Sequence, residues 1–192
     1  MRRMRKTVAI YGGSFDPPHI SHVLAAVYAL KVGGFDQVLV VPVYEHAFHK
    51  RLSPFEHRVR LCELSFAGIA GVEVSTIERA LETPSLTLRT IEHLAREHPD
   101  WAMRLLVGSD VLSDAGKWHA FERIAELAPP FIVARPGYEH PNACAALLPD
   151  VSSTRIRDAL GRRSEPDSEA LLSGSVPRAV LAYIAEHGLY RG

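Results

Sequence analysis

The sequence predicts a single α/β domain in which a mostly parallel sheet is flanked by helices on both faces. Short apolar runs alternate with stretches of helical periodicity along the chain. The 192 residues, 47% of them hydrophobic, are enough for one buried core. No internal repeat or domain boundary interrupts the pattern. We therefore expect residues 1–192 to form one Rossmann-like domain with a C-terminal helical part over about residues 152–192.

The predicted strands are short runs of apolar and β-branched residues, each stopped by Gly, Pro or a polar loop. Residues 7–11 run into Gly12-Gly13, and residues 37–43 are continuously apolar, as expected for a strand that is buried on both faces. The other predicted strands are residues 72–77, 104–107 and 131–134. Ligands bind beyond the carboxyl ends of such strands, so the informative residues should follow them directly.

The predicted helices carry apolar residues at three- and four-residue spacing and are bounded by capping or breaking residues. The first, residues 19–32, is stopped by Gly33-Gly34, and the second, residues 54–68, has Ser53 as its expected N-cap. Further helices are expected over residues 86–98, 120–127, 153–160 and 176–187. The polar stretch 161–174 is expected to be a turn region.

Charge and cysteine content argue against several classes of protein. Lys and Arg total 22, as do Asp and Glu, so the basic excess typical of proteins that bind nucleic acid polymers is absent. No apolar run approaches the ~18 residues of a membrane-spanning helix. Cys62 and Cys144 form no CxxC pair, which suits a reducing compartment. We expect a cytoplasmic protein without membrane or nucleic-acid partners, and leave a homo-oligomer open.

Residues 12–22, GGSFDPPHISH, follow the first predicted strand and are the strongest candidate for a phosphate site. Gly12 and Gly13 allow the backbone to turn sharply and to approach a ligand. The start of the following helix offers unpaired N–H groups and a positive dipole end. His19 and His22 share one face of its first turn, where two imidazoles would donate hydrogen bonds to phosphate oxygens.

Other interpretations of this segment are weaker. Adjacent glycines fit neither the GxGxxG fingerprint nor a P-loop. A His-x-x-His metal site lacks an obvious third ligand, so no metal site is predicted. A plain strand–turn–helix junction explains the glycines alone, but not Asp16-Pro17 and both histidines at the start of the helix.

The same segment, Gly12-Gly13-Ser14-Phe15-Asp16-Pro17-x-His19-x-x-His22, resembles the HxGH-type motif of the nucleotidyltransferase superfamily. The double glycine, and His19 where many relatives carry Thr, make it similar to bacterial nicotinate-nucleotide adenylyltransferases. Ser21 stands where Gly is usual, and its small hydroxyl should be tolerated. The resemblance implies that ATP is bound by Gly12, Gly13, Ser14, Phe15, His19 and His22.

A second motif, residues 152–157, reads SSTRIR near the other end of the chain. Ser152 or Ser153 is a natural N-cap for the helix that follows, and the fork of Arg157 can reach a polyphosphate near its start. The motif resembles the family's SSTxIR sequence, which implies that Ser153, Thr154 and Arg157 bind the ATP phosphates. Alone it would fit a capped surface helix, but two motifs in this order are more specific.

Further matches to the family run through the middle of the chain. Residues 84–87 resemble the PSYT segment with Leu86 in place of the aromatic residue, and residues 135–138 resemble RPGY. The loop 45–50 lacks the family's prolines but keeps His49-Lys50. The indole of Trp118 can stack on a pyridine ring, although plain core packing is nearly as good an interpretation. The resemblance implies nucleotide contacts for Gly108 and Asp110, and mononucleotide contacts for Lys50, Thr87, Trp118, His119 and Arg135.

Together the matches imply that the 5′-phosphate of nicotinate mononucleotide attacks the α-phosphorus of ATP and releases pyrophosphate. Such a transfer depends on positioning and charge neutralisation, for which the expected catalytic residues are His19, His22, Lys50 and Arg157. Mg²⁺ is expected with ATP, held mainly by phosphates and water. Two alternatives stay open: the same reaction on nicotinamide mononucleotide or another phosphorylated acceptor, and a non-catalytic nucleotide-binding sensor.

Overall fold

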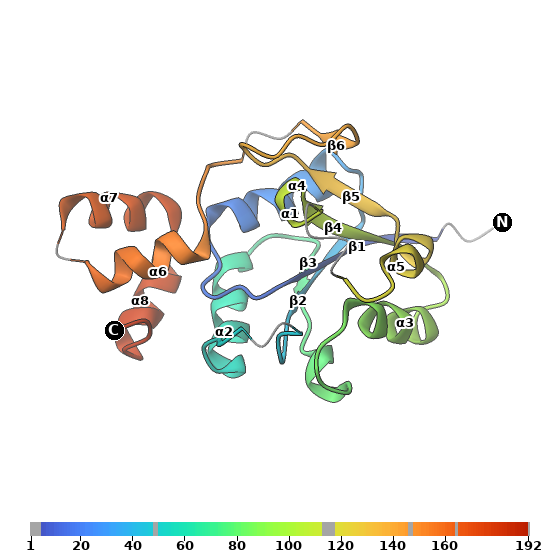
Figure 1. Cartoon of the computed structure of the whole chain (residues 1–192), viewed down its shortest axis with the longest axis horizontal. Coiled ribbons are helices and arrows are strands. Elements are labelled where there is room, and N and C mark those ends of the chain that lie inside the picture. Colours follow the sequence, from blue (N-terminus) through green and yellow to red (C-terminus); the bar gives the residue numbers. More distant parts are fainter. Residues whose placement is uncertain (1–4, 48–49, 113–117, 146–147, 164, 192) are drawn as a thin grey trace.

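The computed structural model describes residues 5–47, 50–112, 118–145, 148–163 and 165–191. Within them, six parallel strands form one sheet in the order β3-β2-β1-β4-β5-β6, with helices on both faces (Figure 1). The strands are β1 (Lys6–Gly13), β2 (Gln37–Pro42), β3 (Val72–Val74), β4 (Trp101–Gly108), β5 (Pro130–Val133) and β6 (Ala143–Cys144). The winding reverses between β1 and β4, and a ligand-binding crevice is expected at the carboxyl ends of these two strands. The predicted fold class is confirmed.

The described helices include every one that the sequence predicts. Their bounds are α1 (Ile20–Lys31), α2 (Phe55–Phe66), α3 (Thr87–Glu97), α4 (Ser109–Leu112), α5 (Phe121–Leu127), α6 (Ser153–Gly161), α7 (Pro166–Ser175) and α8 (Arg178–Glu186). One 3₁₀ turn, η1 (Ile77–Ala80), follows β3. It shortens the strand predicted over 72–77, because Ile77 already belongs to this turn. The N-cap of α2 is Pro54, one residue beyond the predicted Ser53.

The expectation of a polar turn region over residues 161–174 is wrong. Helix α7 occupies most of that stretch, with Pro166 at its first position and Asp167 and Glu169 in its first turn, which are favourable starting residues. Its buried Leu172 belongs to an apolar cluster made by the helices around it. Tertiary packing therefore supports a helix whose own sequence is mostly polar.

The strands of the sheet divide their side chains between two apolar clusters, one on each face. On one face, Ala9 of β1 packs with Ala26 of α1 and Cys62 of α2. On the other, Val8 and Ile10 pack with residues of α3 and α5. This alternation is the period of two expected of a strand between two helical layers.

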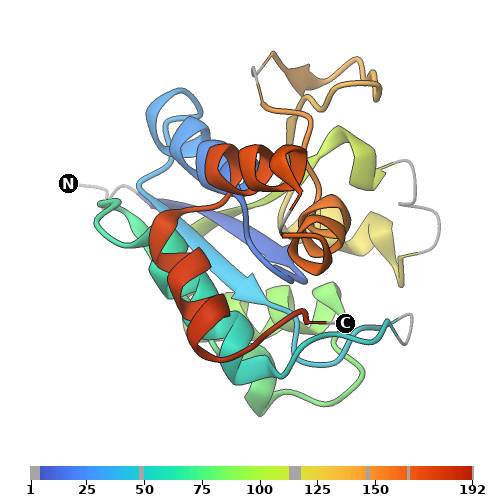
Figure 2. The same ribbon diagram turned by 90° about the vertical axis from the view of Figure 1, so that its left-hand side faces the viewer.

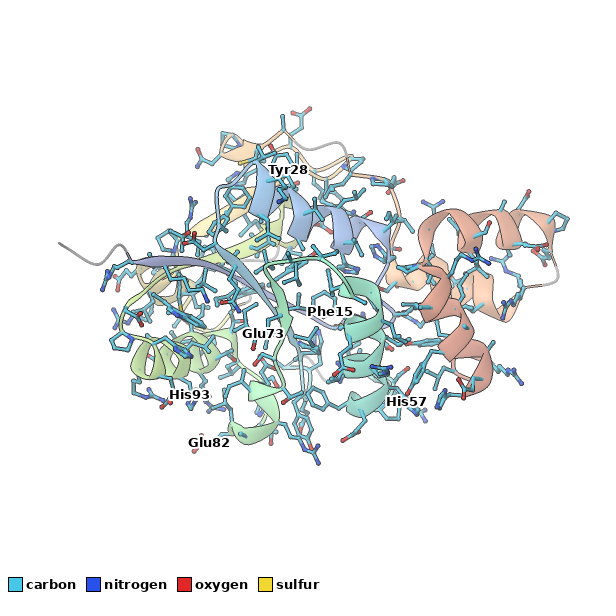
Figure 3. All side chains as sticks on the ribbon, turned by 180° about the vertical axis from the view of Figure 1, so that it is seen from behind. Phe15, Tyr28, His57, Glu73, Glu82 and His93 are labelled. Carbon is cyan, nitrogen blue, oxygen red and sulfur yellow. The ribbon has the colours of Figure 1, made fainter. Side chains whose placement is uncertain are left out.

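The C-terminal helices form a third cluster against α2, to which Leu61, Ile156 and Val180 contribute. Figure 2 shows α8 lying along α2. On the side of α2 that faces these helices, His57 shares a hydrogen bond of 2.9 Å with the hydroxyl of Tyr183 (Figure 3). No helix among the described residues is long and apolar enough to cross a membrane.

Candidate active site

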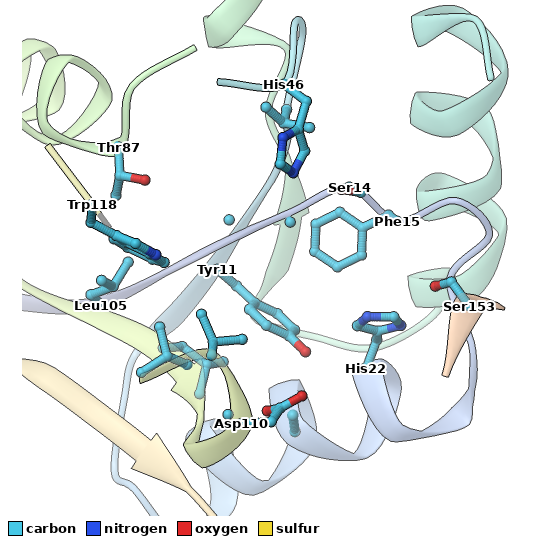
Figure 4. A pocket seen from close by; sticks show the side chains of 18 of the residues that line it. Tyr11, Ser14, Phe15, His22, His46, Thr87, Leu105, Asp110, Trp118 and Ser153 are labelled. Carbon is cyan, nitrogen blue, oxygen red and sulfur yellow. The ribbon is translucent and has the colours of Figure 1, made fainter. Parts of the chain in front are cut away.

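A cavity of about 820 Å³ opens at the carboxyl ends of β1 and β4, and its volume suits a nucleotide-sized ligand. Figure 4 shows Thr87 and Trp118 toward one end of the cavity and His22 and Ser153 toward the other. The lining includes every residue that the sequence predicts for the site except Arg157. Segments that are distant in the sequence thus meet at the predicted edge of the sheet.

The two glycines of the first motif end β1 and do not make the turn, so this part of the prediction is wrong. Gly12 and Gly13 pair in register with Val41 and Pro42 of β2. The left-handed backbone falls at Phe15, with φ of 47° and a side chain that is 1% exposed. A Cβ on Gly12 would meet no atom within 4 Å, so the space beside its backbone is open, and the approach of a ligand there stays a prediction.

His19 and His22 meet at the start of α1 and stay neutral. His19 is the N-cap, and its backbone N–H donates to Nδ1 of His22 over 3.1 Å. Burial, helped by the charge of Arg135, lowers the pKa of His19 to about 3 and the pKa of His22 well below its usual value. Nδ1 of His22 accepts, so in the neutral ring Nε2 carries the proton and is a donor. Nδ1 of His19 is buried without a hydrogen-bond partner among the described residues.

Asp110 and Arg135 lie together beside the end of β4. A Cβ on Gly108 would overlap the carboxylate of Asp110, so a larger residue at this position would displace that side chain. Nε of Arg135 lies 3.8 Å from Oδ2 of Asp110. The same guanidinium donates to the carbonyls of Val151 (2.8 Å) and Pro149 (3.4 Å). Arg135 therefore also ties β5 to the segment that leads into α6.

Four of the predicted mononucleotide residues, Lys50, Thr87, Trp118 and His119, line the cavity away from the fifth, Arg135, which lies beside Asp110. Thr87 is the first residue of α3, so the positive end of this helix dipole faces the same region. Trp118 is half-buried and packs edge-on against Phe121, with 6.0 Å between the ring centroids. It also lines the cavity, so its position is compatible with both interpretations of this residue. His119 and Lys50 are exposed at the edge of the cavity. His49, which precedes Lys50 in this loop, lies outside the described residues.

The second motif is hydrogen-bonded directly to the first. Ser152 is the N-cap of α6, as predicted, and its Oγ accepts from the amide of Arg155 at 3.3 Å. Ser153 donates to the carbonyl of Pro17 over 2.8 Å. Arg157 begins the second turn of α6 outside the cavity lining, where it donates to the backbone of the first motif.

Comparisons with known proteins agree with this site. A model of cytidylyltransferase-like proteins matches residues 10–159. A protein of Anaeromyxobacter sp. (strain K), described as a probable nicotinate-nucleotide adenylyltransferase, is 41% identical in an alignment over 190 residues that covers 97% of this chain and 98% of that protein. A protein of the same description from Streptococcus pneumoniae is 31% identical over 195 residues and covers 98% and 90% of the two chains. The chain belongs to the nicotinate-nucleotide adenylyltransferase family.

One solved structure has the same fold as this chain. It is the Plasmodium falciparum nicotinic acid mononucleotide adenylyltransferase complexed with NaAD, with a TM-score of 0.78 and 21% sequence identity. The similarity covers 96% of this chain and 97% of that one. At this identity the likeness supports the fold alone.

Sequence reasoning missed two residues that shape the cavity of this adenylyltransferase. Tyr11 points into it from β1 (Figure 4). Arg58 of α2 is 1% exposed and donates to the carbonyls of Ser14 (3.0 Å), Val43 (2.7 Å) and Ser53 (2.9 Å). It therefore joins the loops after β1 and β2. The available signal was a charged residue on the otherwise apolar, buried face of a predicted helix.

No three His, Cys, Asp or Glu side chains within the described ranges gather closely enough to hold a metal ion. Two carboxylates near the cavity already have protein partners: Asp16 accepts from Tyr190 and Ser53, and Asp110 lies near Arg135. This donor set fits a divalent ion that is held mainly by substrate phosphates.

Proposed function

We propose that this chain transfers the adenylyl group of ATP to nicotinate mononucleotide, forming nicotinate adenine dinucleotide and pyrophosphate. The observation that carries the proposal is one continuous cavity with His22 and Ser153 toward one end and Thr87 and Trp118 toward the other. The first pair suits polyphosphate and the second suits a pyridine ring. Family membership supports the same reaction.

The protein's part in this reaction is to position two phosphates and to stabilise charge. An oxygen of the acceptor's 5′-phosphate forms a bond to the α-phosphorus, while the bond to the leaving pyrophosphate breaks. Nε2–H of His22 donates to the charge that develops during this step, and His19 lines the same end of the cavity beside it. Because both rings are neutral, they bind phosphate without first taking up a proton.

Two cationic side chains complete the phosphate environment in this proposal. Lys50 lies exposed at the edge of the cavity, where its flexible stem can follow the acceptor's phosphate. Arg157 reaches the polyphosphate from behind the first motif, whose backbone it already holds. Mg²⁺ bound to ATP would neutralise further phosphate charge without a carboxylate cage of its own.

The acceptor end favours nicotinate over nicotinamide. The first N–H groups of α3 at Thr87 and the backbone around Trp118 and His119 are donors, and hydrogen bonds to a carboxylate are stronger than those to a neutral amide. An amide NH₂ would face these donors and be left badly paired, which costs about 1–3 kcal/mol per buried group. We expect roughly a 10²-fold preference in kcat/KM for the nicotinate form.

Pyrophosphate release tests the proposal. The purified chain, with ATP and Mg²⁺, is offered nicotinate mononucleotide, nicotinamide mononucleotide and phosphopantetheine in parallel. Turnover with the first, at least tenfold above the others, supports it. Equal or better turnover with another acceptor would reject the nicotinate assignment. ATP binding without turnover on any acceptor would favour a nucleotide sensor.

A further inference from the structure

The last residues of the chain reach back to the first motif. The hydroxyl of Tyr190 donates to Oδ1 of Asp16 over 2.7 Å, although 174 positions separate the two residues. Asp16 is 3% exposed, and its other oxygen accepts from the amide of Ser53 at 3.2 Å. The positive charge of Arg58 also acts on this carboxylate. Asp16 is thus a buried side chain whose hydrogen-bond partners lie far away along the chain.

The backbone of Asp16 carries the second half of this connection. Its carbonyl accepts from a terminal nitrogen of Arg157 over 2.6 Å, and the other terminal nitrogen of Arg157 donates to Oγ1 of Thr154 at 3.2 Å. Tyr190 and Arg157 therefore hold the same residue from its side chain and from its main chain. A shift of Asp16 would move the acceptor on which the orientation of Arg157 depends.

Strained backbone flanks this connection at both ends. Phe15, directly before Asp16, has φ of 47°, and Tyr190 has φ of 60°. Both values lie in the left-handed region that residues with a side chain rarely adopt, and such conformations persist where the surroundings determine them. The hydrogen bond between Tyr190 and Asp16 is one such determinant. Burial and the nearby Asp16 raise the pKa of Tyr190, so its hydroxyl keeps the proton that it donates.

We propose that Tyr190 is a positioning residue for adenylyl transfer. Its hydroxyl fixes Asp16, and Asp16 in turn fixes the first-motif loop and the guanidinium of Arg157. Tyr190 itself contacts no reacting atom. The inference rests on the proposed function for its kinetic consequence, but the ordering of the loop by the C-terminal residues does not depend on the substrate.

The chain offers a matched control for this hydroxyl. Tyr183 makes a comparable bond from the C-terminal helices to the rest of the domain, over 2.9 Å to His57, but neither residue lines the cavity or touches the first motif. Tyr190→Phe and Tyr183→Phe each remove one hydroxyl and keep the ring. Both variants are therefore expected to fold.

Steady-state kinetics of the two variants test the proposal. Tyr190→Phe is expected to lower kcat about tenfold, equivalent to 1.4 kcal/mol, and to leave KM for nicotinate mononucleotide within twofold. Tyr183→Phe should keep the wild-type kcat. If Tyr190 acts through Arg157, the combination of Tyr190→Phe with Arg157→Lys should lower kcat by clearly less than the product of the two single effects. Wild-type kcat in Tyr190→Phe, or fully multiplicative effects in the double variant, would overturn the proposal.

Hydrogen exchange separates this proposal from the proposed function. Amides of residues 12–22 should exchange at least several-fold faster in Tyr190→Phe than in Tyr183→Phe, with or without substrate. A wild-type chain that turns over no acceptor would refute the proposed function and leave this measurement intact. Equal exchange of that segment in both variants would refute the positioning role.

Discussion

The rings of His19 and His22 lie 3.9 Å apart between centroids, and neither is protonated near neutral pH. Two imidazolium ions at this separation would repel each other, and burial further disfavours both charges. The pair therefore acts through hydrogen bonds and not through net positive charge.

Removing the donor of His22 should slow the reaction strongly. We expect His22→Ala to lower kcat by roughly 10²-fold or more, as for the loss of one donor to a charged transition state. His57→Ala is the control, because it removes a histidine from a helix outside the cavity. The rate of pyrophosphate release should stay near the wild-type value only in the control. Near-normal kcat in His22→Ala would exclude His22 as the donor.

The neutrality of His19 makes stability depend on pH in a defined direction. Its pKa falls from 6.5 to about 3 on folding, so between these values the unfolded chain binds a proton that the folded chain does not. The contribution of His19 to the free energy of unfolding is then fully present above about pH 6.5, and it is lost as the pH falls toward 3. Between pH 7 and 5, the loss from this residue alone is roughly 2 kcal/mol.

Urea denaturation at pH 7 and pH 5 measures this term. Between pH 7 and pH 5 the free energy of unfolding should fall in both proteins. The fall should be roughly 2 kcal/mol smaller in His19→Asn than in the wild type. Ser65→Ala changes a buried side chain but no titratable group, so it serves as the control and should leave the pH dependence unchanged. Equal pH dependence of His19→Asn and the wild type would contradict a neutral, buried His19.

The sequence predicts the helices, the strands and the residues that line the cavity better than it predicts the backbone conformation of the loops. A short apolar run located β1 and helical periodicity located α1. The capping preference of serine left Ser152 and Ser153 as candidates, and Ser152 is the N-cap. The glycine pair predicts a turn at Gly12-Gly13, but the left-handed residue is Phe15, which is buried and held in that conformation by its surroundings. The role of Asp16 was similarly out of reach, because its partners come from residues far along the chain.

Arg157 is expected to act through the geometry of its fork and not only through its charge. Its two terminal nitrogens donate to the carbonyl of Asp16 and to Thr154, and a lysine ammonium cannot make both bonds from the same position. Arg157→Lys should therefore lower kcat about tenfold, measured by pyrophosphate release. Arg155 lies on the same helix, is exposed and pairs with Asp150, so Arg155→Lys is the control. Equal activity of both variants would indicate that Arg157 has only a surface role.

Ser21, which stands where the family motif usually has Gly, contributes to stability through its hydroxyl. It is 2% exposed and donates to the carbonyl of Pro149 over 2.8 Å, which joins the first turn of α1 to the segment before α6. Ser21→Ala should lower the free energy of unfolding by about 1 kcal/mol. Ser21→Gly should cost roughly 1 kcal/mol more, because glycine disfavours the helical backbone.

Ser65 is the matched control for this hydroxyl. It is also buried in a helix, at 7% exposure, but its Oγ has no hydrogen-bond partner within the described part of the chain. Ser65→Ala removes a buried hydroxyl without breaking a bond, so it should leave stability unchanged or raise it. Denaturant titration of Ser21→Ala, Ser21→Gly and Ser65→Ala distinguishes the loss of a bond from the loss of a hydroxyl. Equal stability of the two alanine variants would show that the bond from Ser21 to Pro149 contributes nothing, and that the departure from the family motif is only tolerated.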